Sequence, residues 1–232
     1  MENCKVLLII PAYNEEKNIL KTVQTIKEFA PDLDYIVIND GSTDKTGEIL
    51  DENEINHIDL IENLGIGGAV QTGYKYAYEK NYDIAVQFDG DGQHDVRYVE
   101  KICEPIIDGK ANMCIGTRYL DKSASKFQST AMRRLGSRII SFIIWLFCHK
   151  KITDATSGFR AADRKLIKMF STQYAEDYPE PEAIASTLKN KLRIVEVPVS
   201  MNERTEGKSS ITIWKSIDYM VKVSLAIIIR SM

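Results

Sequence analysis

The first 120 residues alternate short apolar runs rich in β-branched residues with longer segments of helical periodicity. Helices are predicted between the runs, and strands are predicted at KVLLIIP, YIVIND, HIDLIE, DIAVQF and NMCIGT. This alternation indicates βαβ units, and hence an α/β fold with a mostly parallel central sheet and helices on both faces. In such a sheet ligands bind in the loops beyond the carboxyl ends of the strands.

The pattern changes after about residue 120. A polar stretch over 121–130 precedes a nearly all-apolar helix over 138–148, and one more strand is predicted at LRIVEVPV. A second apolar segment, YMVKVSLAIIIRSM, follows at the end of the sequence. Neither segment reaches the ~18–20 apolar residues that a bilayer crossing needs. Basic residues flank the first segment, which fits a helix in a membrane interface, and a buried core helix fits the same pattern equally well.

Composition sets the broad class. The 232 residues, 44% of them hydrophobic and 27% charged, are ordinary for a globular protein of one domain, 1–232. The formal net charge of -3 gives no general attraction for nucleic acid. Four cysteines without a CxxC pair argue against a zinc site or a disulfide framework and suit a reducing cytoplasm. The first apolar run is short and broken by Pro11, so we expect no signal peptide.

The stretch AVQFDGDGQHDVRYVE runs a buried strand directly into a group of aspartates. Asp89 and Asp91 would lie at the carboxyl edge of the sheet, where two carboxylates and substrate phosphates can hold Mg²⁺. A calcium loop of the EF-hand type is an alternative, but His94 stands where that loop needs glycine. A solvated acidic turn is a third interpretation of the same residues.

Two further polar clusters, PAYNEE at 11–16 and NDGSTD at 39–44, also follow predicted strands. Such residues either cap the next helix, as Ser42 or Asp44 would, or surround a nucleoside. The segment NLGIGGAVQTG is rich in glycine, but Val70 breaks the spacing of a dinucleotide-binding motif. It therefore predicts either a plain tight turn or a close approach of the backbone to a nucleotide.

Taken together, these motifs resemble those of family 2 glycosyltransferases, which have the Rossmann-like GT-A fold. The matching segments are PAYNEEKNI, VINDGSTDKT, NLGIGGAVQTG, FDGDGQHD, GTRYL and SGFR. The resemblance is greatest to dolichol-phosphate mannose synthase and the bacterial polyprenyl-phosphate glycosyltransferases, and it covers nearly the whole chain. It implies a nucleotide-sugar-binding half at 1–120 and an acceptor half with amphipathic, membrane-facing helices at 121–232.

The resemblance also implies the residues of the donor site. Asp89 and Asp91 match the family's DxD motif, which holds Mg²⁺ or Mn²⁺ on the donor diphosphate. The residues implied in binding the nucleotide sugar and its metal are Pro11, Ala12, Tyr13, Glu15, Asp40, Ser42, Asp89, Gly90, Asp91, Gln93, Arg204 and Lys208.

Catalytic and acceptor residues follow from the same resemblance. Arg118 and Arg204 match arginines that clamp phosphates, and Asp154 matches the candidate general base, although an anionic phosphate acceptor scarcely needs deprotonation. Glu180 and Glu182 fall near the family's contacts to sugar or acceptor. Here IIS follows the SR pair, where the family usually has two small residues and Asn. The residues implied for the lipid phosphate are Arg118, Arg133, Ser137 and Arg138, of which Arg133 and Ser137 have the spacing of one helix face.

The resemblance implies a metal-dependent, inverting enzyme of glycan biosynthesis. It would transfer a sugar from a nucleoside diphosphate, with UDP preferred and GDP-mannose as the alternative, to undecaprenyl or dolichyl phosphate at the cytoplasmic face of the cell membrane. Expected partners are the donor, the lipid acceptor, the membrane surface and, as in some relatives, a small membrane subunit, but no nucleic acid. Two alternatives are transfer to a soluble glycan or protein, and a nucleotide-sugar-binding partner of a membrane protein without turnover.

Overall fold

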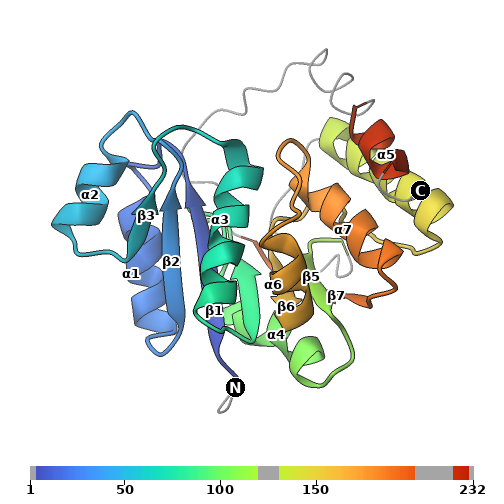
Figure 1. The fold of residues 1–232 in the computed structure, drawn as a ribbon, viewed down its shortest axis with the longest axis horizontal. Helices are drawn as coiled ribbons and strands as arrows, with labels where there is room; N and C mark the ends of the chain where they lie inside the picture. The colour runs from blue at the N-terminus through green and yellow to red at the C-terminus, as the bar shows by residue number, and fades with distance from the viewer. Residues whose placement is uncertain (1–3, 120–130, 202–221, 230–232) are drawn as a thin grey trace.

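The protein is built around one mixed β-sheet. The structure, a computed structural model, describes residues 4–119, 131–201 and 222–229, with the backbone alone for 131–135. In this part of the chain the sheet has seven strands in the order β3-β2-β1-β4-β6-β5-β7 (Figure 1). The strands are β1 (Val6–Ala12), β2 (Asp34–Asn39), β3 (His57–Asp59), β4 (Ile84–Gln87), β5 (Met113–Thr117), β6 (Arg160–Asp163) and β7 (Ile194–Pro198).

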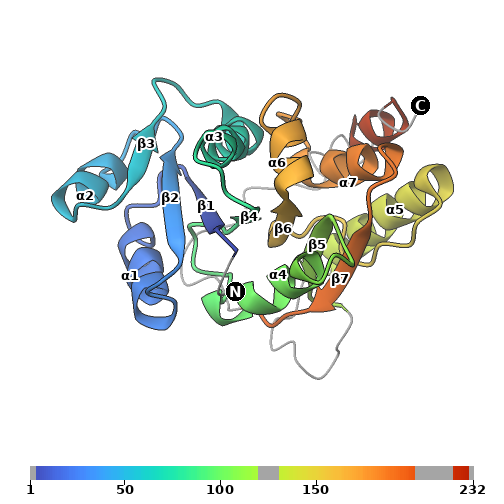
Figure 2. The same ribbon diagram turned by 60° about the horizontal axis from the view of Figure 1, so that its bottom comes forward.

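Helices connect most of the strands. Figure 2 shows α3, α6 and α7 on one side of the sheet and α1 and α4 on the other. A helix over 222–229 lies at the same end of the molecule as α5. The described helices with printed bounds are α1 (Ile19–Phe29), α2 (Thr46–Glu52), α3 (Gly65–Glu79), the 3₁₀ helix η1 (Val96–Tyr98), α4 (Val99–Ile107), α5 (Ala131–Cys148), α6 (Arg164–Phe170) and α7 (Pro179–Lys189).

The alternation of side chains along β1 explains the two layers of helices. Every residue of β1 is buried, because successive side chains point to opposite faces and helices cover both. Leu7 and Ile9 belong to the hydrophobic cluster that includes α3, α6, α7 and α5. Leu8 and Ile10 belong to the second cluster, with α1 and α4. The predicted α/β fold with a mostly parallel sheet and helices on both faces is confirmed.

Strand β6 is the element that the sequence analysis does not predict. Its sequence, RAAD, has no β-branched or aromatic residue, so local preference gives no strand signal. It is a strand because it fills the position between β4 and β5, and it runs antiparallel to both. Since it is antiparallel, its first residue pairs with the last residue of β4, Arg160 opposite Gln87. This pairing brings the SGFR motif to the edge of the sheet where Asp89 lies.

Candidate functional site

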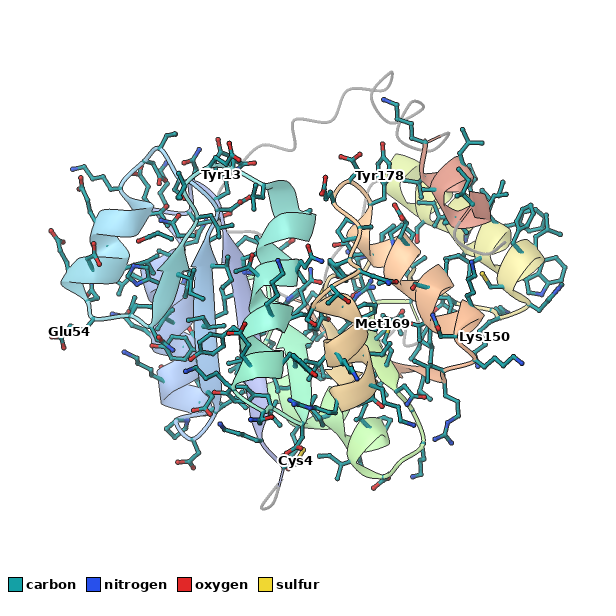
Figure 3. All side chains as sticks on the ribbon, in the orientation of Figure 1. Cys4, Tyr13, Glu54, Lys150, Met169 and Tyr178 are labelled. Carbon is teal, nitrogen blue, oxygen red and sulfur yellow. The ribbon has the colours of Figure 1, made fainter. Side chains whose placement is uncertain are left out.

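A pocket of about 350 Å³ opens at the carboxyl ends of β1, β2 and β4. Figure 3 shows Tyr13 at this edge and Cys4 at the opposite end of the molecule. Among the residues predicted to bind the donor, Ser42 and Gln93 do not line the pocket, and Arg204 and Lys208 lie outside the described residues. The predicted residues that the structure brings together here are Pro11, Ala12, Tyr13, Glu15, Asp40, Asp89, Gly90 and Asp91.

Ser42 joins the two loops that border the pocket. Its Oγ accepts a hydrogen bond of 3.0 Å from the backbone N–H of Asn14, so it does not cap α2, whose N-cap residue is Lys45. In return, Oδ1 of Asn14 accepts a bond of 2.8 Å from the backbone N–H of Thr43. Asn14 has φ of 55°, a left-handed conformation that Asn adopts more readily than most residues.

Asp44 extends the contact between the same loops. Its carboxylate accepts the backbone N–H of Thr46 at 2.9 Å and of Glu16 at 3.1 Å. Burial alone would raise the pKa of Asp44, but the hydrogen bonds from Thr46 and Glu16 outweigh it and hold the pKa below its usual value. The PAYNEE and NDGSTD motifs therefore fix each other, and they position the pocket residues between them.

Asp40 links the pocket to the start of α3. Its Oδ1 accepts the backbone N–H of Leu64 at 2.8 Å, and its backbone oxygen accepts Nδ2 of Asn63 at 3.1 Å. Its side chain, only 2% exposed, therefore has a structural partner as well as a place in the pocket. Sequence analysis left the glycine-rich segment open between a tight turn and a nucleotide contact. The structure places four of its residues in the pocket lining: Asn63, Gly65, Ile66 and Ala69.

Asp89 and Asp91 both face the pocket from the turn after β4. Within the described ranges no group of three or more His, Cys, Asp and Glu side chains could hold a metal ion by itself. Two carboxylates that line an open pocket nevertheless fit Mg²⁺ or Mn²⁺, because such ions take phosphates and water as their other ligands. The EF-hand alternative does not fit, since Asp95 forms an ion pair with Arg97 and caps η1.

Arg118 and Asp154 form a buried ion pair. The guanidinium donates from Nε and Nη2 to the carboxylate at 2.8 and 2.9 Å, and Asp154 is 0% exposed. Burial alone would lower the pKa of Arg118, but the bond to Asp154 raises it above its ordinary value. The bidentate pair orients both side chains, so this geometry favours positioning, while the general-base role of Asp154 stays a prediction.

Glu196 on β7 fixes the loop that carries Asp154. Its carboxylate accepts the backbone N–H groups of Thr153 at 2.9 Å and of Asp154 at 3.0 Å. No motif marks Glu196, because its role depends on the pairing of β5 with β7, which the sequence does not reveal.

The first turn of α7 carries Glu180 and Glu182. Nη1 of Arg160 donates to the backbone oxygen of Glu180 at 2.9 Å. The pKa of Glu180 is raised above its ordinary value, mainly by burial. The charge of Arg160 opposes this shift, and the charge of Asp89 adds to it. Glu180 does not line the pocket, and its contact to sugar or acceptor stays a prediction. Glu182 follows two residues further along α7, and its contact to sugar or acceptor is likewise a prediction.

Helix α5 carries the residues predicted for the lipid phosphate. Ser137 is 4% exposed, and its Oγ has no hydrogen-bond partner among the described residues. The same holds, within those ranges, for Oγ of Ser141, one turn further along, which the sequence analysis did not select. Its spacing of four residues from Ser137 was the available signal. Arg138 is exposed, and for Arg133 the structure describes the backbone only.

The outer side of α5 is apolar. Ile140 and Ile144 pack into the core, as do Val223 and Ile227 of the helix over 222–229. Within the described ranges, no helix combines the length and the hydropathy that a bilayer crossing requires. The outer apolar face consists of Ile139, Phe142, Trp145, Leu146 and Phe147 of α5, which are 36–57% exposed.

The sequence was compared with those of known proteins. Residues 7–170 match the sequence profile of glycosyl transferase family 2. The chain is 36% identical over 214 residues to UDP-N-acetylglucosamine--dolichyl-phosphate N-acetylglucosaminyltransferase of Methanococcus voltae, covering 84% of each chain. It is 25% identical over 220 residues to polyprenol monophosphomannose synthase of Mycolicibacterium smegmatis, covering 90% of this chain and 81% of that protein.

A solved structure agrees with the fold. Glucosyl-3-phosphoglycerate synthase from Mycobacterium tuberculosis, crystallised with Mn²⁺, UDP and phosphoglyceric acid, superposes with a TM-score of 0.72. The match covers 99% of this chain and 79% of that chain, at 17% sequence identity. At this level of identity, the likeness supports the GT-A fold and no more.

Proposed function

Because the chain belongs to glycosyl transferase family 2, and is therefore a glycosyltransferase, we propose that it transfers a sugar from a nucleoside diphosphate to a polyprenyl phosphate. The observation that carries the proposal is the meeting of three strand ends in one pocket. The aspartates of the DGD turn line the same pocket as Tyr13 and Asp40. One nucleoside diphosphate could therefore place its diphosphate near Asp89 and its nucleoside near Asp40.

The donor is proposed to be a UDP-sugar. The relative from Methanococcus voltae is named for UDP-N-acetylglucosamine, and the Mycobacterium tuberculosis structure was solved with UDP and Mn²⁺. Asp89 and Asp91 would hold Mg²⁺ or Mn²⁺, with Gln93 adjacent. Such an ion offsets the charge that develops on the leaving nucleoside diphosphate. Gln93 keeps the turn in shape, since its backbone N–H donates to Oδ1 of Asp91 at 3.0 Å.

The acceptor is proposed to be an undecaprenyl or dolichyl phosphate. Its phosphate oxygen forms a bond to the anomeric carbon as the bond to the donor diphosphate breaks, with inversion, and no proton has to be removed. The residues then act by orientation and by charge. Arg118 suits the binding of a phosphate, because its bonds to Asp154 use Nε and Nη2. Among the described residues, the Nη1 hydrogens are not used in this pair. Ser137 and Ser141 would add hydroxyl donors from α5.

We propose that the protein meets its acceptor at the cytoplasmic face of the membrane. The apolar face of α5 supports this location, because aromatic and branched side chains over a helix surface enter the acyl boundary of a bilayer. Exposed basic residues lie at both ends of that face, Arg138 before it and Lys150 after it, where they would meet lipid phosphates. A small membrane protein subunit, as in some relatives, is the further partner that the resemblance implies.

The proposal is tested with purified protein, Mn²⁺, a panel of radiolabelled UDP- and GDP-sugars, and undecaprenyl or dolichyl phosphate in detergent. We expect label from a UDP-sugar to enter the organic phase. Asp91→Asn should reduce this transfer by about 100-fold or more, because it removes half of the metal-binding carboxylates. Asp108→Asn is the matched control, since Asp108 pairs with Lys110 away from the pocket and should transfer normally.

Other outcomes identify the alternatives. Label that stays in the aqueous phase, attached to an added glycan or protein, would support a soluble acceptor. Nucleotide-sugar binding without transfer to any acceptor, in the presence and absence of membranes, would support a binding partner without turnover.

A further inference from the structure

His94 contacts Asp89 with both of its ring nitrogens. Nδ1 accepts the backbone N–H of Asp89 at 2.9 Å, and Nε2 lies 3.4 Å from Oδ2 of the same residue. Because Nδ1 is the acceptor, the neutral ring carries its hydrogen on Nε2, which faces the carboxylate. One side chain therefore holds both the backbone and the carboxylate of the first metal-binding aspartate.

Aromatic packing fixes the ring of His94. It stacks on Phe159 with a centroid distance of 4.8 Å and an interplanar angle of 21°, and it meets the edge of Phe88 at 5.6 Å. Its side chain is 3% exposed, and its backbone forms an isolated bridge with Met201. Burial lowers the pKa of His94 below its ordinary value.

The backbone of Gly158 also lies close to the carboxylate of Asp89. A Cβ atom at this position would lie 3.0 Å from Oδ2 and 3.1 Å from Oδ1 of Asp89, closer than ordinary van der Waals contact. The carboxylate is therefore approached both by the ring of His94 and by the bare backbone of Gly158. Two residues of the SGFR motif thus act on Asp89: Gly158 lies next to its carboxylate, and Phe159 stacks on the His94 ring that contacts it.

We propose that His94 is a positioning residue, which sets the orientation in which Asp89 presents its carboxylate to the metal of the donor complex. The inference rests on the proposed function and adds to it a residue that no motif role covers. Histidine suits the position because its rigid ring places an acceptor and a donor on opposite edges. Groups that orient a ligand in this way typically change metal affinity by about 10–100-fold.

The test separates the two contacts. His94→Asn keeps an acceptor near the position of Nδ1, His94→Gln keeps a donor near that of Nε2, and His94→Phe keeps only an aromatic ring against Phe159. His57→Phe is the matched control, because His57 lies outside the pocket, next to Asp51 and Asp59. Binding of Mn²⁺ in the presence of UDP is measured by electron paramagnetic resonance, and binding of UDP without metal by calorimetry.

We expect His94→Phe to weaken Mn²⁺ binding about tenfold or more, and His94→Gln to restore most of it, while metal-free UDP binding changes less than twofold. In addition, nitrogen-15 spectra of histidine-labelled wild-type protein should show the Nε2–H tautomer for His94. Wild-type Mn²⁺ affinity in His94→Phe, or an Nδ1–H tautomer, would overturn the inference. Thermal unfolding identifies a variant that has lost its fold. If His94→Phe has lost its fold, the Mn²⁺ affinity of His94→Gln tests the inference instead.

The inference and the proposed function can fail separately. Normal sugar transfer by the wild type, together with unchanged metal binding in His94→Phe, would remove the positioning role and leave the function. No sugar transfer by the wild type, together with the expected weakening of Mn²⁺ binding in His94→Phe in the presence of UDP, would remove the proposed function and leave the positioning role.

Discussion

The donor pocket and the surface of α5 differ in how their polar groups are used. Around the pocket, Asn14, Ser42 and Asp44 form hydrogen bonds between loops, and Asp40 holds the start of α3. On α5, two buried hydroxyls have no partner among the described residues, and large apolar side chains face outward.

The difference fits the two proposed substrates. A nucleotide sugar is small and polar, so loops fixed in advance can bind it without a large ordering cost. A lipid phosphate comes with a membrane, which would cover the apolar face and give the hydroxyls an anion to bind. Among the described residues, the loops of the pocket are thus held by bonds within the protein, whereas the proposal gives the α5 surface an external partner. Each expectation below tests one side of this contrast.

The largest effect should come from the ion pair between the two regions. Asp154→Ala leaves the Arg118 guanidinium buried without its partner, and we expect the free energy of unfolding to fall by about 3–5 kcal/mol. Asp108→Ala breaks the exposed pair with Lys110 and should leave the free energy of unfolding nearly unchanged. Urea denaturation of both variants measures the difference. Equal losses of unfolding free energy would mean that the buried pair stabilises the fold no more than the exposed pair does.

The catalytic role of Asp154 needs a milder change. Asp154→Asn keeps the shape and one acceptor for Arg118, so the fold should survive. If Asp154 acts by positioning, kcat should fall without a change in the shape of the pH–rate profile. Loss of the acidic limb of that profile would instead support a general base, and near-normal turnover would remove Asp154 from the mechanism.

The second effect concerns the outer face of α5. Trp145 is 51% exposed and packs against Phe142 with ring centroids 5.7 Å apart. Trp145→Glu should weaken binding to anionic lipid vesicles by about tenfold or more, because it puts a charge in place of an aromatic side chain that would enter the bilayer. Ile61→Glu is the matched control, since Ile61 is fully exposed beyond β3 in the donor region. Co-sedimentation measures both, and equal binding by the two variants would exclude the α5 face.

The third effect uses the buried hydroxyls. Ser137→Ala removes an oxygen without a described partner, so we expect the free energy of unfolding to stay equal or rise by up to about 1 kcal/mol. The KM for the lipid phosphate should nevertheless increase several-fold. Ser157→Ala is the control, because its Oγ donates to the backbone oxygen of Gly116 and its loss should cost about 1 kcal/mol. Destabilisation by Ser137→Ala would show that the hydroxyl is part of the fold instead.

The sequence predicts most of the donor side because the signal there is local. Polar clusters directly after apolar runs identify strand ends, and parallel strands bring those ends together. The same reasoning assigned Ser42 to the nucleotide, or to a helix cap, although it bonds to Asn14. A motif shows which residues share a loop, but it does not show which neighbouring loop they contact.

The features that the sequence does not predict depend on distant contacts. Strand β6 exists because of the space between β4 and β5, and its direction determines which loop faces Asp89. His94 entered the sequence analysis only as a departure from a calcium loop. Its contacts with Phe159, and thus its hold on Asp89, require an antiparallel pairing that RAAD does not reveal.

The smallest effect tests how the pocket loops respond to pH. Hydrogen bonds keep the pKa of Asp44 below its usual value in the folded protein, so its charged form stabilises the fold. That contribution is fully present above the unfolded pKa of about 3.9 and is lost as the pH falls through the folded pKa. Asp44→Asn lacks this titration. The stability difference between wild type and variant should therefore shrink from pH 5 to about pH 2, as chemical denaturation would measure. A constant difference would mean that Asp44 contributes through its shape and neutral hydrogen bonds, and that the loops around the pocket do not need its charge.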